Sequence, residues 1–421
     1  MNPIHPLASL DPRAPLLSVE GLEVNFRTAE GTVKAVRGID FELKPGEVLG
    51  IVGESGSGKS VTAMAAMGLL PRSARVKGSV RFRGEELLHR REKQLMPFRG
   101  KAISMIFQDP MTSLNPVYSV GWQIVEAIQA HQDVSKEEAL KIAIELLRKV
   151  GIPNPEDRVA NYPHEFSGGM RQRVVIAIAI ANDPEVILAD EPTTALDVTV
   201  QAQVLEALRA ALLSTHAALL LITHDLGVIA GIADRVLVMY AGRPVEIATV
   251  DEIFYNPSMP YTLGLLGSLP RVDTDGTERL RPIPGSPPMM IGEPKGCPFA
   301  PRCPLAADIC RETEPELTQI GAATGHLAAC HFAKEAHDRG ASLFAATSAD
   351  IDTTAGDQHG GRPESGLVYG QGPDELRAPG PGNYVLAEGF SLAGPGGYET
   401  AADEEDGTAG PGTSDGEETT P

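Results

Sequence analysis

Residues 53–60 read Gly-Glu-Ser-Gly-Ser-Gly-Lys-Ser, and the chain on either side predicts a strand over residues 47–52 and a helix over residues 61–70. A Gly-rich turn between a strand and a helix exposes backbone N–H groups that cradle phosphates. Its lysine reaches the terminal phosphates and its last hydroxyl binds magnesium. This context distinguishes the stretch from an ordinary Gly-rich turn. It predicts an α/β nucleotide-binding fold whose phosphate ligands are Gly53, Glu54, Ser55, Gly56, Ser57, Gly58, Lys59, Ser60 and Val61.

A second stretch predicts another anion site. Residues 166–170 read Phe-Ser-Gly-Gly-Met, ahead of a helix expected over residues 170–181. The bare amides of Ser167, Gly168 and Gly169 at a helix N-terminus attract a phosphate through their N–H groups and the helix dipole. One chain needs only one phosphate site for one nucleotide. The second site therefore indicates two chains that face head to tail, each capping the nucleotide of the other.

An acidic pair ends the third stretch, residues 186–191, which read Val-Ile-Leu-Ala-Asp-Glu. Asp190 closes an apolar strand, where it would hold magnesium through water, and Glu191 would polarise the attacking water. Taken in this order, the three stretches resemble those of the ATPase subunits of ABC transporters. The resemblance implies an ATP site with magnesium.

Three further residues match positions of that family. Gln108, after a strand expected over residues 102–107, resembles the Q-loop glutamine, which contacts magnesium and senses the γ-phosphate. Asp197, in Thr-Ala-Leu-Asp, resembles the D-loop residue. His224, after a strand expected over residues 219–223, resembles the switch histidine, which holds the attacking water in line with the catalytic glutamate. A satisfied core histidine is the alternative for His224.

Two residues fit the resemblance less closely. Phe26, on a strand expected over residues 19–26, matches the aromatic residue that stacks on adenine, but an aromatic core residue is the alternative. Met170 stands where the family usually has Gln after Ser-Gly-Gly. We expect binding to survive, because the amides and Ser167 make the contact, while a side-chain contact to the partner is in doubt.

The second half of the chain narrows the family. The stretches Tyr-Thr-Leu-Gly-Leu-Leu-Gly at 261–267 and Gly-Cys-Pro-Phe-Ala-Pro-Arg-Cys-Pro at 296–304 are similar to the C-terminal extension of oligopeptide and dipeptide importer ATPases. This resemblance covers about residues 16–332. With the composition of the two ends, we expect a flexible N-terminus (1–15), an ABC ATPase domain with a RecA-like core and a helical subdomain at about 112–170 (16–250), the extension (251–335) and a disordered acidic tail (336–421).

All four cysteines lie in the extension, spaced C-x5-C-x6-C-x19-C. Disulfides are disfavoured in a reducing compartment, and zinc usually takes closer pairs. Four thiolates with wide gaps can hold a [4Fe–4S] cluster, which the resemblance also implies; zinc and free thiols remain alternatives. Because these cysteines are far in sequence from Lys59 and Glu191, we expect them to affect the extension and its docking more than nucleotide binding. The cluster ligands would be Cys297, Cys303, Cys310 and Cys330.

Charge and hydropathy restrict the partners. The formal net charge is −20, and residues 335–421 hold 17 acidic and 3 basic residues, a composition that predicts disorder. That tail either solvates the chain or docks a protein. The chain shows no basic patch of the kind that binds nucleic acid. No apolar run approaches the roughly 18 residues of a membrane span, and no secretory signal is visible. We expect a peripheral protein at the cytoplasmic face of the membrane.

Together these features predict an ATPase that energises peptide import. The resemblance implies a second ATPase subunit, a heterodimer being favoured, with two transmembrane permease subunits and an extracytoplasmic substrate-binding protein. An importer for nickel, haem or glutathione is one alternative, and a soluble ABC ATPase outside transport is another. The single nucleotide domain, the lack of heptads and the importer-type extension argue against the soluble class.

Overall fold

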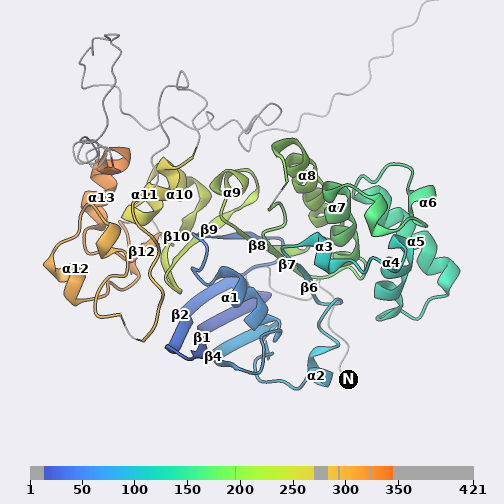
Figure 1. Cartoon of the computed structure of the whole chain (residues 1–421), viewed down its shortest axis with the longest axis horizontal. Coiled ribbons are helices and arrows are strands. Elements are labelled where there is room, and N and C mark those ends of the chain that lie inside the picture. Colours follow the sequence, from blue (N-terminus) through green and yellow to red (C-terminus); the bar gives the residue numbers. More distant parts are fainter. Residues whose placement is uncertain (1–13, 195, 270–282, 293, 322–324, 345–421) are drawn as a thin grey trace, which may run out of the picture.

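The computed structural model describes residues 14–194, 196–269, 283–292, 294–321 and 325–344. Within these ranges an eight-stranded sheet runs in the order β11-β12-β10-β9-β3-β8-β7-β6 beside a four-stranded antiparallel sheet, β2-β1-β4-β5 (Figure 1). The strands of the large sheet are β3 (Val48–Val52), β6 (Ile103–Ile106), β7 (Val186–Asp190), β8 (Ala218–Thr223), β9 (Arg235–Tyr240), β10 (Arg243–Thr249), β11 (Thr318–Gln319) and β12 (Leu327–Ala328). Those of the small sheet are β1 (Leu17–Thr28), β2 (Gly31–Leu43), β4 (Ala74–Phe82) and β5 (Glu85–Glu86).

The centre of the large sheet is parallel and buried on both faces. Every residue of β3, β7 and β8 is buried, which explains why these strands read as continuous apolar runs and do not alternate. Helix α1 (Lys59–Ala66) follows β3 and contacts strands of both sheets. It ends four residues before the expected Leu70, because Gly68 adopts a left-handed φ of +63° that terminates the helix.

One short helix precedes β6, and the other helices of this part of the chain follow it. Serine or aspartate side chains cap the N-termini of several of them: Ser119 accepts from the N–H of Trp122, Ser167 from Met170 and Asp197 from Val200. The Ser167 cap starts α7 at Gly168, two residues before the start predicted from sequence. The helices are α2 (Glu92–Leu95), α3 (Pro110–Ser113), α4 (Val120–Gln129), α5 (Lys136–Lys149), α6 (Pro155–Arg158), η2 (Pro163–Glu165), α7 (Gly168–Ala179), α8 (Val198–Thr215) and α9 (Leu226–Ile232).

The C-terminal segment continues the large sheet. Strand β12 pairs with β10, with Glu246 opposite Ala328, and β11 pairs with β12. Its helices are α10 (Val250–Tyr255), α11 (Pro260–Gly267), η3 (Ala300–Arg302), α12 (Asp308–Glu312), α13 (Ala333–Arg339) and η4 (Gly340–Phe344). Helix α10 packs on β9 and β10, whereas α12 and α13 lie beyond the strands at that edge (Figure 1).

The start predicted for the disordered tail, residue 336, is too early. Ala336 and Leu343 are fully buried and Phe344 nearly so, because η4 packs against α11. The rest of the predicted tail, 345–421, and the predicted flexible N-terminus up to residue 13 lie outside the described residues. None of the helices in the described ranges combines the length and hydropathy that crossing a bilayer requires.

Candidate functional site: a nucleotide site at the ends of β3, β7 and β8

Strand register brings the predicted catalytic residues to one edge of the sheet. In the parallel pairing Val52 lies opposite Thr223, and Asp190 lies opposite Ile222. The residues that follow these strand ends, Gly53, Glu191 and His224, therefore leave the sheet at the same edge. Ligands bind at this carboxyl edge in open α/β sheets, where loops replace the pairing of strands. The strand register therefore brings these three residues to the same edge of the sheet.

Glycine conformation shapes the phosphate-binding loop between β3 and α1. Gly53, Gly56 and Gly58 have φ values of +154°, +81° and +103°. At Gly58 an added Cβ would lie 2.3 Å from the carbonyl oxygen of Ala35 on β2, so no larger residue fits. The hydroxyl of Ser57 is buried and has no hydrogen-bond partner among the residues that the structure describes. An unpaired buried hydroxyl in this loop fits a site that receives a polar ligand.

The side chain of Lys59 folds back over the phosphate-binding loop. Its Nζ donates to the carbonyl oxygens of Gly53 (2.8 Å) and Glu54 (3.1 Å) and lies 4.0 Å from Glu191 Oε1. Burial lowers the pKa of Lys59, opposed by the carboxylates of Glu191, Asp190 and Glu54. The ammonium therefore sits in a dry site with compensating carboxylates, where a polyanion gains a strong interaction.

Ser60 and Asp190 form the predicted metal pair. The Ser60 hydroxyl donates to Asp190 Oδ1 at 2.8 Å. Burial raises the pKa of Asp190, and the neighbouring Glu191 carboxylate adds to that rise, while the Ser60 hydrogen bond opposes it. Hydroxyl and carboxylate oxygens are the ligands that magnesium prefers, and a cation here would offset the cost of burying Asp190.

Glu191 is the centre of the site. Its Oε2 accepts hydrogen bonds from Gln108 Nε2 (3.0 Å) and Thr194 Oγ1 (2.8 Å), and His224 Nδ1 lies 3.3 Å away. Its φ of +47° is unusual for a residue other than glycine, and its N–H donates to the carbonyl of Ile222 at 2.8 Å. Such strained backbone persists where surrounding contacts hold it, and it is concentrated at active sites. The structure thus joins Lys59, Gln108, Glu191 and His224, which lie far apart in sequence.

Ser167–Gly169 and Asp197 form a separate group. An added Cβ on Gly169 would lie 2.2 Å from Val200 Cγ1, so the start of α7 packs closely on the start of α8. Asp197 caps α8, accepting from the N–H of Val200 at 3.0 Å. In the described part of the chain, no hydrogen bond joins this group to the Lys59–Glu191 group. This separation agrees with the expectation that the two groups serve different nucleotides.

Phe26 lies on β1, opposite the part of β2 that approaches the phosphate-binding loop. It pairs with Val33 on β2, two residues from Ala35, whose carbonyl contacts Gly58. Its side chain is partly exposed and packs against the core of the small sheet. The position is compatible with an adenine-stacking residue and with the core alternative.

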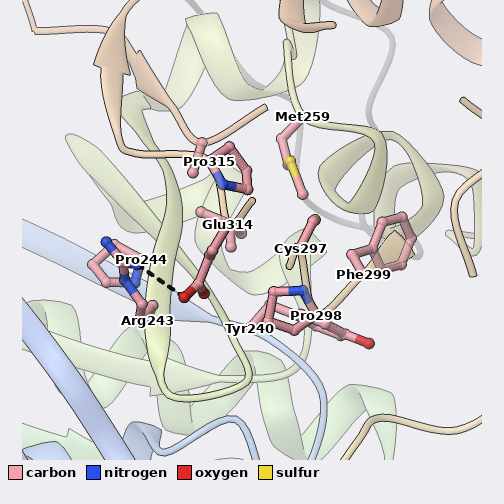
Figure 2. Close-up of a pocket in the computed structure, with 11 residues that line it drawn as sticks. Tyr240, Arg243, Pro244, Met259, Cys297, Pro298, Phe299, Glu314 and Pro315 are labelled. Atoms are coloured by element: carbon pink, nitrogen blue, oxygen red, sulfur yellow. Dashed lines mark ion pairs between the residues drawn. The ribbon is translucent and has the colours of Figure 1, made fainter. Parts of the chain in front are cut away.

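The four cysteines converge. Cys297, Cys303, Cys310 and Cys330 all line one apolar cavity with Phe299 and Met259. An adjacent cavity shares Met259, Cys297 and Phe299, which Figure 2 shows together with the ion pair between Arg243 and Glu314 (3.3 Å). Burial raises the pKa of Cys303 to about 11 and that of Cys330 to about 12. Across the described residues, no three His, Cys, Asp or Glu side chains are close enough to hold a single metal ion.

The segment from Cys297 to Cys330, called here the cysteine segment, contacts the nucleotide site. This contradicts the expectation from its distance in sequence. Arg302, next to Cys303, donates from Nη1 and Nη2 to the two carboxylate oxygens of Glu54, at 2.6 Å and 2.9 Å. The hydroxyl of Tyr261 on α11 accepts from the N–H of Glu54 at 2.8 Å. The sequence pattern does not predict Arg302, Tyr261 or Thr194 as site residues, since nothing local in the chain indicates their partners.

Known proteins match both halves of the chain. A model described as ABC transporter matches residues 36–194, and one described as oligopeptide/dipeptide transporter, C-terminal region, matches residues 245–310. The oligopeptide transport ATP-binding protein OppD of Mycobacterium tuberculosis is 59% identical over 318 residues, which span 75% of this chain and 52% of that protein. OppD of Bacillus subtilis is 54% identical over 307 residues, 72% of this chain and 86% of that protein. The dipeptide transport ATP-binding protein DppD of the same species is 53% identical over 305 residues, with 72% and 91% coverage.

A solved structure agrees on the fold. The post-hydrolysis dimer of the ATP-binding cassette MJ0796, bound to ADP and Pi, aligns with a TM-score of 0.50 at 25% identity, over 56% of this chain and 98% of that chain. The chain spans about half the length of the mycobacterial relatives and most of the length of the Bacillus relatives. By these matches and the site described above, the chain belongs to the family of ATP-binding proteins of oligopeptide and dipeptide ABC transporters, with the α/β nucleotide-binding fold of that family.

Proposed function

We propose that this chain hydrolyses ATP to energise the import of oligopeptides or dipeptides through an ABC transporter. The observation that carries the proposal is the convergence of Lys59, Ser60, Gln108, Asp190 and His224 around Glu191, in a chain whose C-terminal region matches the oligopeptide/dipeptide model. The names of the relatives support peptides as the solute.

ATP is the substrate that these residues fit. The amides of the loop from Ser55 to Ser60 and the ammonium of Lys59 would bind the phosphates, and Phe26 would stack on adenine. Ser60, Asp190 and Gln108 would hold Mg²⁺, which neutralises charge on the β- and γ-phosphates when bound. The unpaired hydroxyl of Ser57 and the buried Ser60–Asp190 pair support this assignment.

Glu191 would act as the general base. Gln108 and Thr194 both donate to Oε2, which leaves Oε1 free of hydrogen bonds in the described structure and directed to the side of Lys59. A carboxylate held in this way can accept a proton from an attacking water. His224 would hold the water and Glu191 in line, and its exposed ring, about 60% accessible, can meet a substrate phosphate.

The second group of residues supports a two-chain site. Ser167, Gly168 and Gly169 form the N-terminus of α7, which packs on the start of α8, where Asp197 is the cap. They would cap the nucleotide of a second ATPase subunit facing head to tail, as a heterodimer in our proposal. The related cassette MJ0796 is described as dimeric. Closure of such a dimer would drive two permease subunits, and an extracytoplasmic protein would select the peptide; the chain would sit at the cytoplasmic face of the membrane.

The cysteines fit an iron–sulfur cluster better than a single ion. Zinc needs four donors that converge on one point, whereas a [4Fe–4S] cluster needs four thiolates around a volume. The four cysteines surround one cavity, and no single-ion group exists among the described side chains. The raised pKa values mean that bound iron would have to displace protons from at least Cys303 and Cys330. The cluster would have a structural role and would cross-link the part of the chain from Cys297 to Cys330.

Purification from its native membrane tests the proposal. The chain should co-purify with two polytopic membrane proteins, and a peptide-loaded binding protein should stimulate the ATPase activity of the assembly. Recovery with ribosomes or DNA and without a permease would overturn it in favour of a soluble ATPase. Stimulation by a nickel-, haem- or glutathione-loaded binding protein, and not by peptide, would move the chain to another importer.

A further inference from the structure

Glu54 places a carboxylate in the phosphate-binding loop. A free carboxylate there would repel the phosphates that the loop binds, by Coulomb interaction at short range. The structure pairs this carboxylate with both terminal nitrogens of Arg302, at 2.6 Å and 2.9 Å, in the bidentate geometry that gives the strongest carboxylate–guanidinium contact. The Glu54 N–H is bound by Tyr261 and its carbonyl by Lys59. Every polar group of Glu54 is therefore held, two of them by the C-terminal segment.

Arg302 is itself rigid. Its side chain is only 4% exposed, and Nε donates to the carbonyl of Pro284 at 2.8 Å. Nη1 also donates to the hydroxyl of Tyr240 at 3.3 Å, and the guanidinium lies 5.8 Å from the ring centres of Tyr240 and Phe299. Tyr240, Tyr261 and Phe299 pack on each other with centroids 4.6–5.4 Å apart. Through Tyr261 and Arg302 this aromatic cluster contacts Glu54 of the phosphate-binding loop.

The turn that carries Arg302 begins and ends on cysteines. The N–H of Ala300 donates to the carbonyl of Cys297, and the N–H of Cys303 donates to the carbonyl of Ala300, at 3.0 Å and 3.3 Å. The N–H of Cys297 in turn donates to the carbonyl of Cys310 at 2.8 Å. These backbone bonds tie the position of Arg302 to the positions of Cys297, Cys303 and Cys310.

We propose that Arg302 is a positioning residue of the nucleotide site, through which the cysteine segment sets the affinity of the phosphate-binding loop. It acts in two ways: it neutralises Glu54 beside the phosphates, and it holds a loop with three positive-φ glycines in one conformation before the nucleotide arrives. Preorganisation of this kind raises affinity because the ordering cost is already met. The inference rests on the ATP site proposed above.

The two effects predict a specific pattern in a double-mutant cycle. We expect Arg302→Met to raise the Kd for Mg-ATP of the full-length chain by about 10-fold, in the range that residues without ligand contact impose through a coupled element. Arg302→Lys should raise it less, because the charge remains. Arg302→Met/Glu54→Gln should recover part of the loss, because the unpaired carboxylate is gone; recovery in the double variant is the signature of acting through Glu54.

Two variants separate positioning from stability. Arg311→Met removes an exposed ion pair with Asp308 in α12 of the same segment and should change neither Kd nor Tm. His326→Gln breaks a buried pair with Glu246, for which no hydrogen bond to the loop is found in the described structure, and should lower Tm while leaving the Kd unchanged. Binding is measured by equilibrium dialysis of Mg-ATP, with Tm recorded on the same samples.

Each outcome is decisive. An Arg302→Met chain that binds Mg-ATP within twofold of wild type overturns the inference, as does a His326→Gln chain that loses affinity to the same extent. Should Arg302→Met fail to fold, Arg302→Lys and Glu54→Gln decide, and wild-type affinity in both refutes the inference. A wild-type chain that does not bind Mg-ATP refutes instead the ATP site on which the inference rests.

Discussion

Replacing Glu191 by glutamine tests the proposed chemistry with little disturbance of the structure. Glu191 accepts its two hydrogen bonds, from Gln108 and Thr194, on the same oxygen. A glutamine can place its amide oxygen there and keep both bonds, so the side chain stays in position while its basicity and its charge beside Lys59 are lost. Loss of a general base costs roughly 10²–10⁴ in rate, and we expect turnover to fall by about 10² or more, equivalent to about 2.7 kcal/mol of barrier.

The assay is phosphate release by the assembled transporter. Glu191→Gln should bind ATP and trap a closed dimer, detected as a larger species only when ATP is present. Thr194→Val is the matched control: it removes one hydrogen bond to the same oxygen, worth about 1 kcal/mol, and should slow turnover only about 5-fold. Lys59→Ala should lose nucleotide affinity instead, because it removes the buried ammonium.

Near-normal phosphate release from the Glu191→Gln assembly would refute the assignment. The matching variant of the partner subunit tests the one alternative, in which the partner's site carries all of the hydrolysis. If that partner variant alone abolishes turnover, the partner site carries the hydrolysis and the role of Glu191 is restricted to the other site.

Three further predictions concern the C-terminal half. The hydrogen bond to Glu246 raises the pKa of His326 above its ordinary 6.5, so its contribution to the free energy of unfolding is complete below about pH 6.5 and is lost as pH rises through the raised value. His326→Gln should flatten that loss in chemical-unfolding curves, and an unchanged slope would exclude this pair as its source. Truncation after Phe344 should leave ATPase activity and transport intact. Truncation after Ala336 should lower Tm by several degrees, because it removes buried Leu343 and Phe344. Equal Tm values for the two truncations would show that these two residues do not stabilise the fold. Anaerobically purified chain should be brown with about four irons, and Cys303→Ser should lose them; zinc by elemental analysis would replace the cluster, and no metal would leave free thiols.

Local pattern determined much of the nucleotide site. Three glycines and a lysine between an apolar strand and a helix define the phosphate-binding loop because the turn must adopt positive φ at those positions. The predicted strands before Gln108, Glu191 and His224 are present as β6, β7 and β8. Parallel pairing then aligns their carboxyl ends, so that residues directly after the strands meet without any further information. For these residues, order along the chain was enough.

Boundaries and partners were less predictable. The end of α1 depends on one left-handed glycine, and the start of α7 on a serine cap, both of which shift an element without changing its periodicity. The predicted tail start at 336 was too early because η4 buries two apolar residues against α11, a contact between segments about 80 residues apart that composition does not reveal.

The sequence by itself therefore determined the family, the nucleotide site and the four grouped cysteines. Each of these depends on residues that are close together in the chain or aligned by strand register. Only the tertiary structure decided that Arg302 pairs with Glu54, 248 residues away, and that His326 pairs with Glu246, 80 residues away. A charged side chain reveals nothing of its partner in periodicity or spacing. Its partner is selected when the chain folds, because burial makes an unpaired charge costly wherever the opposite charge lies.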